Sequence, residues 1–204
     1  MAFLILAVLI LTGCGSRAQD PLVQSVRAAV QNVGQTPAAP TPVAQQRLAI
    51  IQAIRDAGAE DPILLVALPE RSAVATLGVG GDNLGVITWI DAGGVSVALK
   101  NGVIVSTRGL GHDLIVSDVS GSVAALKMKR SSHTREQRYL NGEGQLHGIE
   151  LSCAAELEAK KVTETCHSET RRVVNTYELK HNRVIRSRQW LGPELGYAEI
   201  EQLQ

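Results

Sequence analysis

The chain has 204 residues, and its 20 basic and 20 acidic side chains give a formal net charge of zero at pH 7. A balanced charge supplies no overall field that would draw the protein to nucleic acid or to an acidic lipid surface. Aromatic residues make up only 3% of the sequence, against 45% for all apolar residues. The core must therefore be built mainly from Val, Ile, Leu and Ala.

The first 13 residues predict a cleaved export signal. They form an uncharged apolar run that leads into Leu-Thr-Gly-Cys at residues 11–14, the pattern of a lipobox. The run is shorter than the roughly 20 residues needed to span a bilayer. Residues 1–13 would be removed, and Cys14 would carry the lipid anchor. Because the run lacks the Lys or Arg with which export signals usually open, a plain anchor, a buried helix and a true start upstream of Met1 are alternatives.

Gly15 follows Cys14. In lipoproteins generally, an Asp at this position retains the protein at the inner membrane. We therefore expect attachment to the outer membrane through the N-terminal lipid, on its periplasmic face.

Residues 14–42 are predicted to form a lipidated N-terminus and a proline-rich tether. Asp20 and the proline after it suit the start of one short helix. The prolines at positions 37, 40 and 42 then favour extended chain, because each removes a backbone donor.

Residues 43–204 are expected to form a single β-rich domain. A helix over residues 43–57 comes first, with Leu48, Ile51 and Ile54 on one side and Gly58 as its stop. Beyond it, Gly, Asn and Asp separate segments rich in Val, Ile and Thr about every eight to twelve residues. This spacing is typical of an antiparallel β-sandwich or a partly open barrel.

The clearest hairpin joins residues 95–99 to residues 103–105 through Asn101 and Gly102. We prefer a three-residue loop that ends in a left-handed Gly102 to a two-residue Asn-Gly turn. The longer loop would place five apolar side chains on one face, namely Val95, Val97, Leu99, Val103 and Val105. Two further hairpins are predicted, residues 144–158 with 161–169 and residues 173–179 with 184–190.

Cys153 and Cys166 are the two cysteines that lipidation would leave, and an exported domain sits where disulfides persist. A hairpin centred between Ala159 and Lys160 would place them directly opposite each other, within reach of a disulfide. The alternative is a zinc site that adds His167 and His147, but neither cysteine belongs to a close Cys-x-x-Cys pair.

Enzyme motifs are missing from the sequence, which has no Gly-x-Ser-x-Gly, His-Glu-x-x-His or phosphate-binding loop. His112 and Asp113 suggest acid–base chemistry. Neighbours in a strand point to opposite faces, however, so we interpret them as a loop histidine beside a turn-forming aspartate. No catalytic residue, metal or cofactor is predicted.

Arg186, Arg188 and Trp190 alternate along one predicted strand and would share a face. An indole can stack on a sugar ring and a guanidinium can hold a carboxylate, which would suit an acidic polysaccharide or a partner protein. The alternative is a core tryptophan covered by arginine side chains through cation–π contact.

The sequence resembles the YjbF/GfcB family of lipoproteins, which are encoded with exopolysaccharide and group 4 capsule secretion genes. The likeness spans residues 43–204 and rests on the lipobox, Trp89, the Asn-Gly turn, the cysteine pair and four blocks. These blocks are residues 107–114, residues 175–177, Ser-Arg-Gln-Trp at 187–190, and Pro193.

The resemblance implies an outer-membrane lipoprotein with an antiparallel β domain that assists export or assembly of a surface polysaccharide. It implies other secretion proteins as partners and no established reaction. We therefore predict a non-enzymatic binding or scaffold protein. The alternatives are a polysaccharide-modifying enzyme that uses His112 and Asp113, and a structural envelope lipoprotein without glycan contact.

Overall fold

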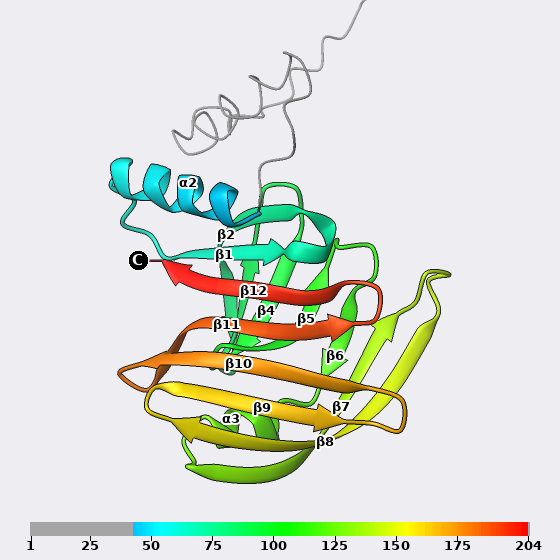
Figure 1. Cartoon of the computed structure of the whole chain (residues 1–204). Helices are drawn as coiled ribbons and strands as arrows, with labels where there is room; N and C mark the ends of the chain where they lie inside the picture. Colours follow the sequence, from blue (N-terminus) through cyan, green and yellow to red (C-terminus); the bar gives the residue numbers. More distant parts are fainter. Residues whose placement is uncertain (1–42, 204) are drawn as a thin grey trace, which may run out of the picture. The chain divides into compact units, whose positions relative to one another are not determined.

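The computed structural model describes residues 43–203, which contain one antiparallel sheet of twelve strands (Figure 1). The helical elements are α2 (Val43–Asp56), the short 3-10 helix η1 (Pro69–Arg71) and α3 (Ser120–Ala125). The strands are β1 (Ile63–Leu68), β2 (Ala73–Asn83), β3 (Val86–Ile90), β4 (Ser96–Lys100), β5 (Val103–Arg108), β6 (Leu114–Ser117), β7 (Arg130–Leu140), β8 (Leu146–Glu158), β9 (Lys161–His167), β10 (Arg172–Lys180), β11 (Arg183–Gly192) and β12 (Gly196–Leu203). The predicted mainly β, antiparallel class is confirmed.

The strand order is β5-β4-β3-β2-β1-β12-β11-β10-β9-β8-β7-β6, so β1 and β12 pair at the centre of the sheet. The two edge strands, β5 and β6, approach each other and nearly close the sheet into a barrel. Side chains join this seam: the Leu114 backbone N–H donates to Thr107 Oγ1 at 3.0 Å, and the Arg108 guanidinium donates to the carbonyl of Ile115 at 3.4 Å. Of the two predicted architectures, a β-sandwich and a partly open barrel, the structure has the barrel.

One face of each strand lines the interior, as the alternation of buried and exposed residues along β8, β9 and β10 shows. The largest apolar cluster draws on β1–β6, β11 and β12, and its buried members are Leu64, Val66, Leu68, Leu77, Trp89, Val97, Leu99, Ile104, Leu114, Leu191, Leu195, Ala198 and Ile200. Apart from Trp89 the cluster is aliphatic, as the composition predicted.

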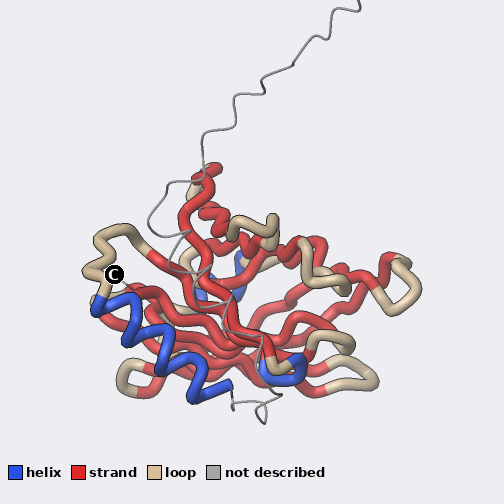
Figure 2. The backbone as a smooth tube through the Cα atoms, turned by 90° about the horizontal axis from the view of Figure 1, so that it is seen from above, coloured by secondary structure: helices blue, strands red, loops and turns tan. Residues whose placement is uncertain are grey.

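Helix α2 lies along the outside of the sheet, beside β1 and β2 (Figures 1 and 2). It covers the outer side of β1, which explains why β1 is buried on both faces. Arg47 bonds Glu199 at 2.6 Å and Glu201 at 2.9 Å, so the Arg47 side of the helix faces β12. Leu48 is consequently 68% exposed, so the predicted apolar stripe was wrong at that position.

The β4–β5 connection corrects a second prediction. Lys100 pairs with Val103 across a two-residue Asn101-Gly102 turn with φ of 51° and 85°, instead of a three-residue loop. A bulge between Ala98 and Leu99, with Val105 as the extra residue on β5, then shifts the register. The bulge places Val97, Leu99, Ile104 and Thr107 on the buried face. Without it, the two-residue turn would have mixed apolar and polar side chains on that face.

The other two predicted hairpins are present as β8–β9 and β10–β11. Cys153 pairs with Cys166 in the register that the sequence indicated. The predictions for residues 1–42, including the signal, the lipid on Cys14 and the short tether helix, lie outside the described residues. Within residues 43–203, no helix has the length and apolar character needed to cross a membrane.

Candidate functional site

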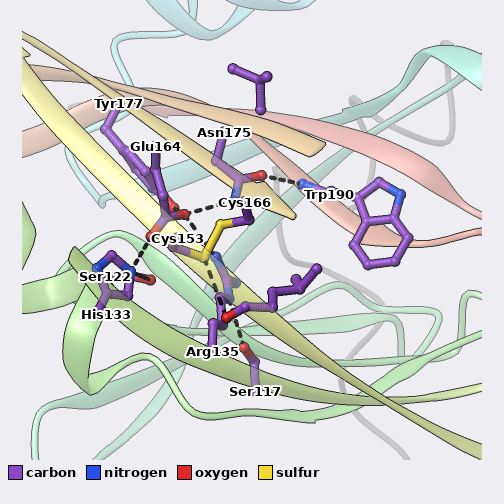
Figure 3. Close-up of a disulfide and its surroundings, with 12 residues drawn as sticks. Ser117, Ser122, His133, Arg135, Cys153, Glu164, Cys166, Asn175, Tyr177 and Trp190 are labelled. Atoms are coloured by element: carbon purple, nitrogen blue, oxygen red, sulfur yellow. Dashed lines mark hydrogen bonds and ion pairs between the residues drawn. A yellow bond between two sulfur atoms is a disulfide. The ribbon is translucent and has the colours of Figure 1, made fainter. Parts of the chain in front are cut away.

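A buried carboxylate, Glu164, is the centre of a polar cluster inside the barrel (Figure 3). It projects from β9 between Val162 and Cys166, on the face that strand alternation turns inward. Its Oε1 atom lies 2.8 Å from His133 Nε2. Its Oε2 atom accepts hydrogen bonds from three donors: Asn175 Nδ2 at 2.7 Å, Arg135 Nη1 at 3.2 Å and Tyr177 Oη at 3.2 Å.

The cluster fixes the ionisation of its members. Burial by itself would raise the pKa of Glu164, but the hydrogen bond from His133, the charge of Arg135 and the hydrogen bond from Asn175 lower that pKa to about 2. Burial, together with the charge of Glu164, raises the pKa of Tyr177. Glu164 is therefore an acceptor-only carboxylate at neutral pH, and Tyr177 stays protonated and donates to it.

Arg135 lies on β7 and links Glu164 of β9 to Ser117 of β6. Its guanidinium Nε donates to Ser117 Oγ at 3.0 Å, while Nη2 is buried and has no partner among the described residues. His133, two residues earlier on β7, sits beneath α3. A Cβ added at Gly121 of α3 would lie 2.6 Å from the His133 side chain, so only glycine lets the helix approach this closely.

The Cys153–Cys166 disulfide lies next to the polar cluster, with an S–S distance of 2.04 Å (Figure 3). His133, Cys153 and Glu164 bring three ligand-type atoms within 4.8 Å of one another. Zinc is bound by thiolates, however, and both sulfurs are consumed in the disulfide. The geometry therefore does not favour a metal at this place or the zinc site weighed from the sequence.

Two buried amides, Asn175 and Gln189, join other parts of the barrel to β11. Asn175 Oδ1 accepts a hydrogen bond from the Trp190 backbone N–H at 2.8 Å. Gln189, which is fully buried, accepts from the Ile104 N–H at 2.9 Å and donates to the Gly102 carbonyl at 2.8 Å. The β4–β5 turn is thereby fastened to β11 across the interior, and a Cβ on Gly102 would collide with Val184 of β11.

His112 and Asp113 occupy the loop between β5 and β6. Asp113 is buried and accepts three hydrogen bonds: from Thr107 Oγ1 at 2.9 Å, the Gly109 N–H at 3.0 Å and the Leu110 N–H at 3.1 Å. The carboxylate thus shapes the loop, as the turn interpretation predicted. His112 Nδ1 is buried without a partner among residues 43–203.

Trp190 lies in the interior instead of on a surface. It is 3% exposed, clusters with Cys166 and Val173, and has the Arg171 guanidinium 5.6 Å above its ring. Its surroundings match the alternative interpretation, a core tryptophan covered by an arginine, although that arginine is Arg171. The buried indole has no free face for a sugar ring.

Arg186 and Arg188 take part in contacts on the β11–β12 surface. Arg186 bonds Glu201 at 2.8 Å and lies 3.6 Å from Glu178, and its side chain is 48% exposed. Hydrogen bonding to Glu201 raises the pKa of Arg186. Arg188 stacks 3.3 Å from the ring centroid of Tyr197. Contact of these two arginines with a glycan or a partner stays a prediction.

The sequence reasoning missed Arg135 and Glu164. Arg135 gave no signal of its own, because both faces of β7 are polar and nothing local distinguishes it from the exposed Arg138 on the same strand. Glu164 did carry a signal. It alternates with Val162 and Cys166, so period-two reasoning places it on the buried face.

These features define a nearly closed antiparallel barrel whose characteristic sequence blocks are used in buried contacts. A family model described as "Group 4 capsule polysaccharide lipoprotein gfcB, YjbF" matches residues 24–203. The chain therefore belongs to this family, and the resemblance inferred from the sequence blocks is confirmed.

The crystal structure of the hypothetical lipoprotein YmcC from Escherichia coli (K12) is similar to the present one. The TM-score is 0.62 at 18% identity, covering 92% of this chain and 97% of that chain. At this level of identity the likeness establishes the fold alone. Comparison with curated proteins gives no match.

Proposed function

We propose that the protein is an outer-membrane lipoprotein, facing the periplasm, that assists export or assembly of a capsular or related exopolysaccharide by binding or scaffolding and without catalysis. Family membership supports the link to capsule polysaccharide, and the family description names a lipoprotein and no reaction. The lipobox at residues 11–14 supports the anchor.

One observation carries the non-catalytic part of the proposal: the polar side chains in the blocks shared with the family are used to hold the barrel together. Asp113 shapes the loop at the β5–β6 seam, Asn175 links Glu164 to β11, and Gln189 fastens the β4–β5 turn. A general acid or base must reach a substrate proton, but these groups are buried and already bonded within the fold.

The enzyme alternative would rest on His112 and Asp113. Both oxygens of Asp113 accept hydrogen bonds from the loop itself, and among residues 43–203 His112 has no acidic partner to orient it for acid–base work. A contact surface near Arg186 and Arg188 is compatible with binding, because the Arg186 guanidinium is half exposed.

The proposal is tested by complementing a deletion strain and measuring polymer at the cell surface. The wild-type gene should restore the polymer, and so should His112→Ala. Cys14→Ser should restore it poorly, since the anchor is lost. Normal polymer in the deletion strain would favour the structural envelope role. Loss of polymer with a His112→Ala protein of unchanged melting temperature would favour the enzyme.

A further inference from the structure

A half-open pocket of about 310 Å³ lies at one end of the barrel, where the turns of β8–β9 and β10–β11 meet the chain that leaves α3. Its volume falls at the lower end of the roughly 300–1,000 Å³ typical of small-ligand pockets. Four polar residues, Lys127, Lys160, His181 and Asn182, line it. The pocket is separate from the Glu164 cluster and from Arg186 and Arg188, none of which lines it.

The walls of the pocket are fixed by backbone contacts. The Leu179 N–H donates to the Lys160 carbonyl at 2.7 Å, which ties the end of β10 to the β8–β9 turn. His181 and Asn182 both have positive φ, 51° and 59°, as a tight two-residue turn requires. Lys160 and His181 are thus presented by short, closed turns and not by long loops.

The charge in the pocket is unbalanced. Within residues 43–203, neither Lys127 nor Lys160 lies within 4.0 Å of a carboxylate, whereas Arg186 has two carboxylate neighbours. Glu158 is exposed on the same hairpin but does not line the pocket. The two ammonium groups therefore favour an anionic ligand.

Apolar residues also line the pocket, among them Leu157 and Leu179. Leu157 and Leu179 are partly buried and pack against a core cluster that contains Val162 and Tyr177. Both leucines line the pocket together with His181, so the C–H face of a sugar ring has apolar side chains to rest against. Asn182 supplies both a donor and an acceptor for hydroxyl groups.

We propose that this pocket binds an anionic sugar unit of a polysaccharide. The acid group contacts Lys127 and Lys160, and the ring lies over Leu157 and Leu179. The inference rests on the proposed function, since it names the class of glycan that the protein would hold. It also moves the expected contact away from Arg186, whose charge is already paired.

The test is calorimetric titration of the full-length protein in detergent with trigalacturonic acid, with maltotriose as the neutral probe and inorganic phosphate as the non-sugar anion. Fragments of the host's own acidic polymer are titrated in parallel. We expect saturable binding of an acidic saccharide that weakens with added salt, and no comparable binding of maltotriose. Lys127→Gln with Lys160→Gln should weaken this binding by about tenfold or more, because two charge-assisted contacts are lost.

Lys129→Gln with Lys161→Gln is the matched control, since it removes the same charge from exposed lysines outside the pocket. This variant should bind within about twofold of wild type, and both double variants should keep the wild-type melting temperature. The pocket proposal is wrong if neither acidic saccharide binds, if the Lys127/Lys160 variant binds normally, or if phosphate displaces the saccharide at equal concentration.

These outcomes are distinct from failure of the proposed function. Binding that survives in the Lys127/Lys160 variant but disappears with Arg186→Gln and Arg188→Gln would reject the pocket and retain a glycan-binding role. Normal surface polymer in the deletion strain would reject the export role whatever the titrations show.

Discussion

Arg135 Nη1 on β7 lies 3.2 Å from Glu164 Oε2 on β9, and both side chains are 1% exposed. The contact passes over β8, which separates the two strands in the sheet. A lone charge in this interior would cost far more free energy than the pair, so each residue lowers the cost of burying the other. The fold must therefore bring both side chains into the interior together, whereas an apolar side chain could be buried there without a specific partner.

Replacing Glu164 with Gln should cost about 3–5 kcal/mol of unfolding free energy, because it leaves the buried Arg135 charge uncompensated. The double variant Arg135→Met, Glu164→Gln should be destabilised by less than the sum of the two single changes. Urea denaturation of the four proteins measures this coupling. Additive single effects would contradict the pairing.

Stability should fall on acidification in a manner that depends on Glu164. Its folded pKa of about 2 lies below the ordinary value of 4.5, so it stabilises the fold above about pH 5 and loses this contribution as the pH approaches 2. The loss should amount to about 3 kcal/mol. The difference between the denaturation midpoints of wild type and Glu164→Gln, measured between pH 7 and pH 2, should shrink as the pH falls below about 4.5. A constant difference across this range would count against the prediction.

Loss of the disulfide should destabilise the barrel moderately. Cys153 and Cys166 are 13 positions apart, and closing a loop of this size contributes about 3 kcal/mol. Reductant should therefore lower the melting temperature of wild type. The double variant Cys153→Ala, Cys166→Ala should melt lower from the outset and be insensitive to reductant. A wild-type melting curve that reductant leaves unchanged would show that the bridge contributes little.

Gln189→Leu should cost about 2–4 kcal/mol, because it strands the buried Ile104 N–H and Gly102 carbonyl without partners. Hydrogen exchange at the Ile104 amide should be faster in this variant than in wild type. Arg188→Gln on the same strand is the control. Its side chain stacks on Tyr197, so we expect a loss below about 1 kcal/mol. Equal effects of the two changes would mean that Gln189 does not fasten the turn.

The sequence by itself determined the features that depend on short stretches of chain. Segment spacing predicted an antiparallel β fold, and a tight turn after Glu158 fixed the register that sets Cys153 opposite Cys166. Such a register follows from counting residues away from the turn, so no distant partner is needed. Counting predicted the wrong register for β4–β5, because a bulge adds Val105 to β5 and counting from the turn does not foresee an added residue.

Only the tertiary structure decided which polar side chains are buried. Arg135 and Arg138 share β7 and belong to the same basic cluster in the sequence, yet Arg135 is buried against Glu164 whereas Arg138 is exposed. Gln189 likewise finds its partners more than 80 residues away. A charged or amide side chain is buried only where the folded chain supplies matching partners, and that supply comes from other strands. The local sequence around such a residue therefore does not specify its burial.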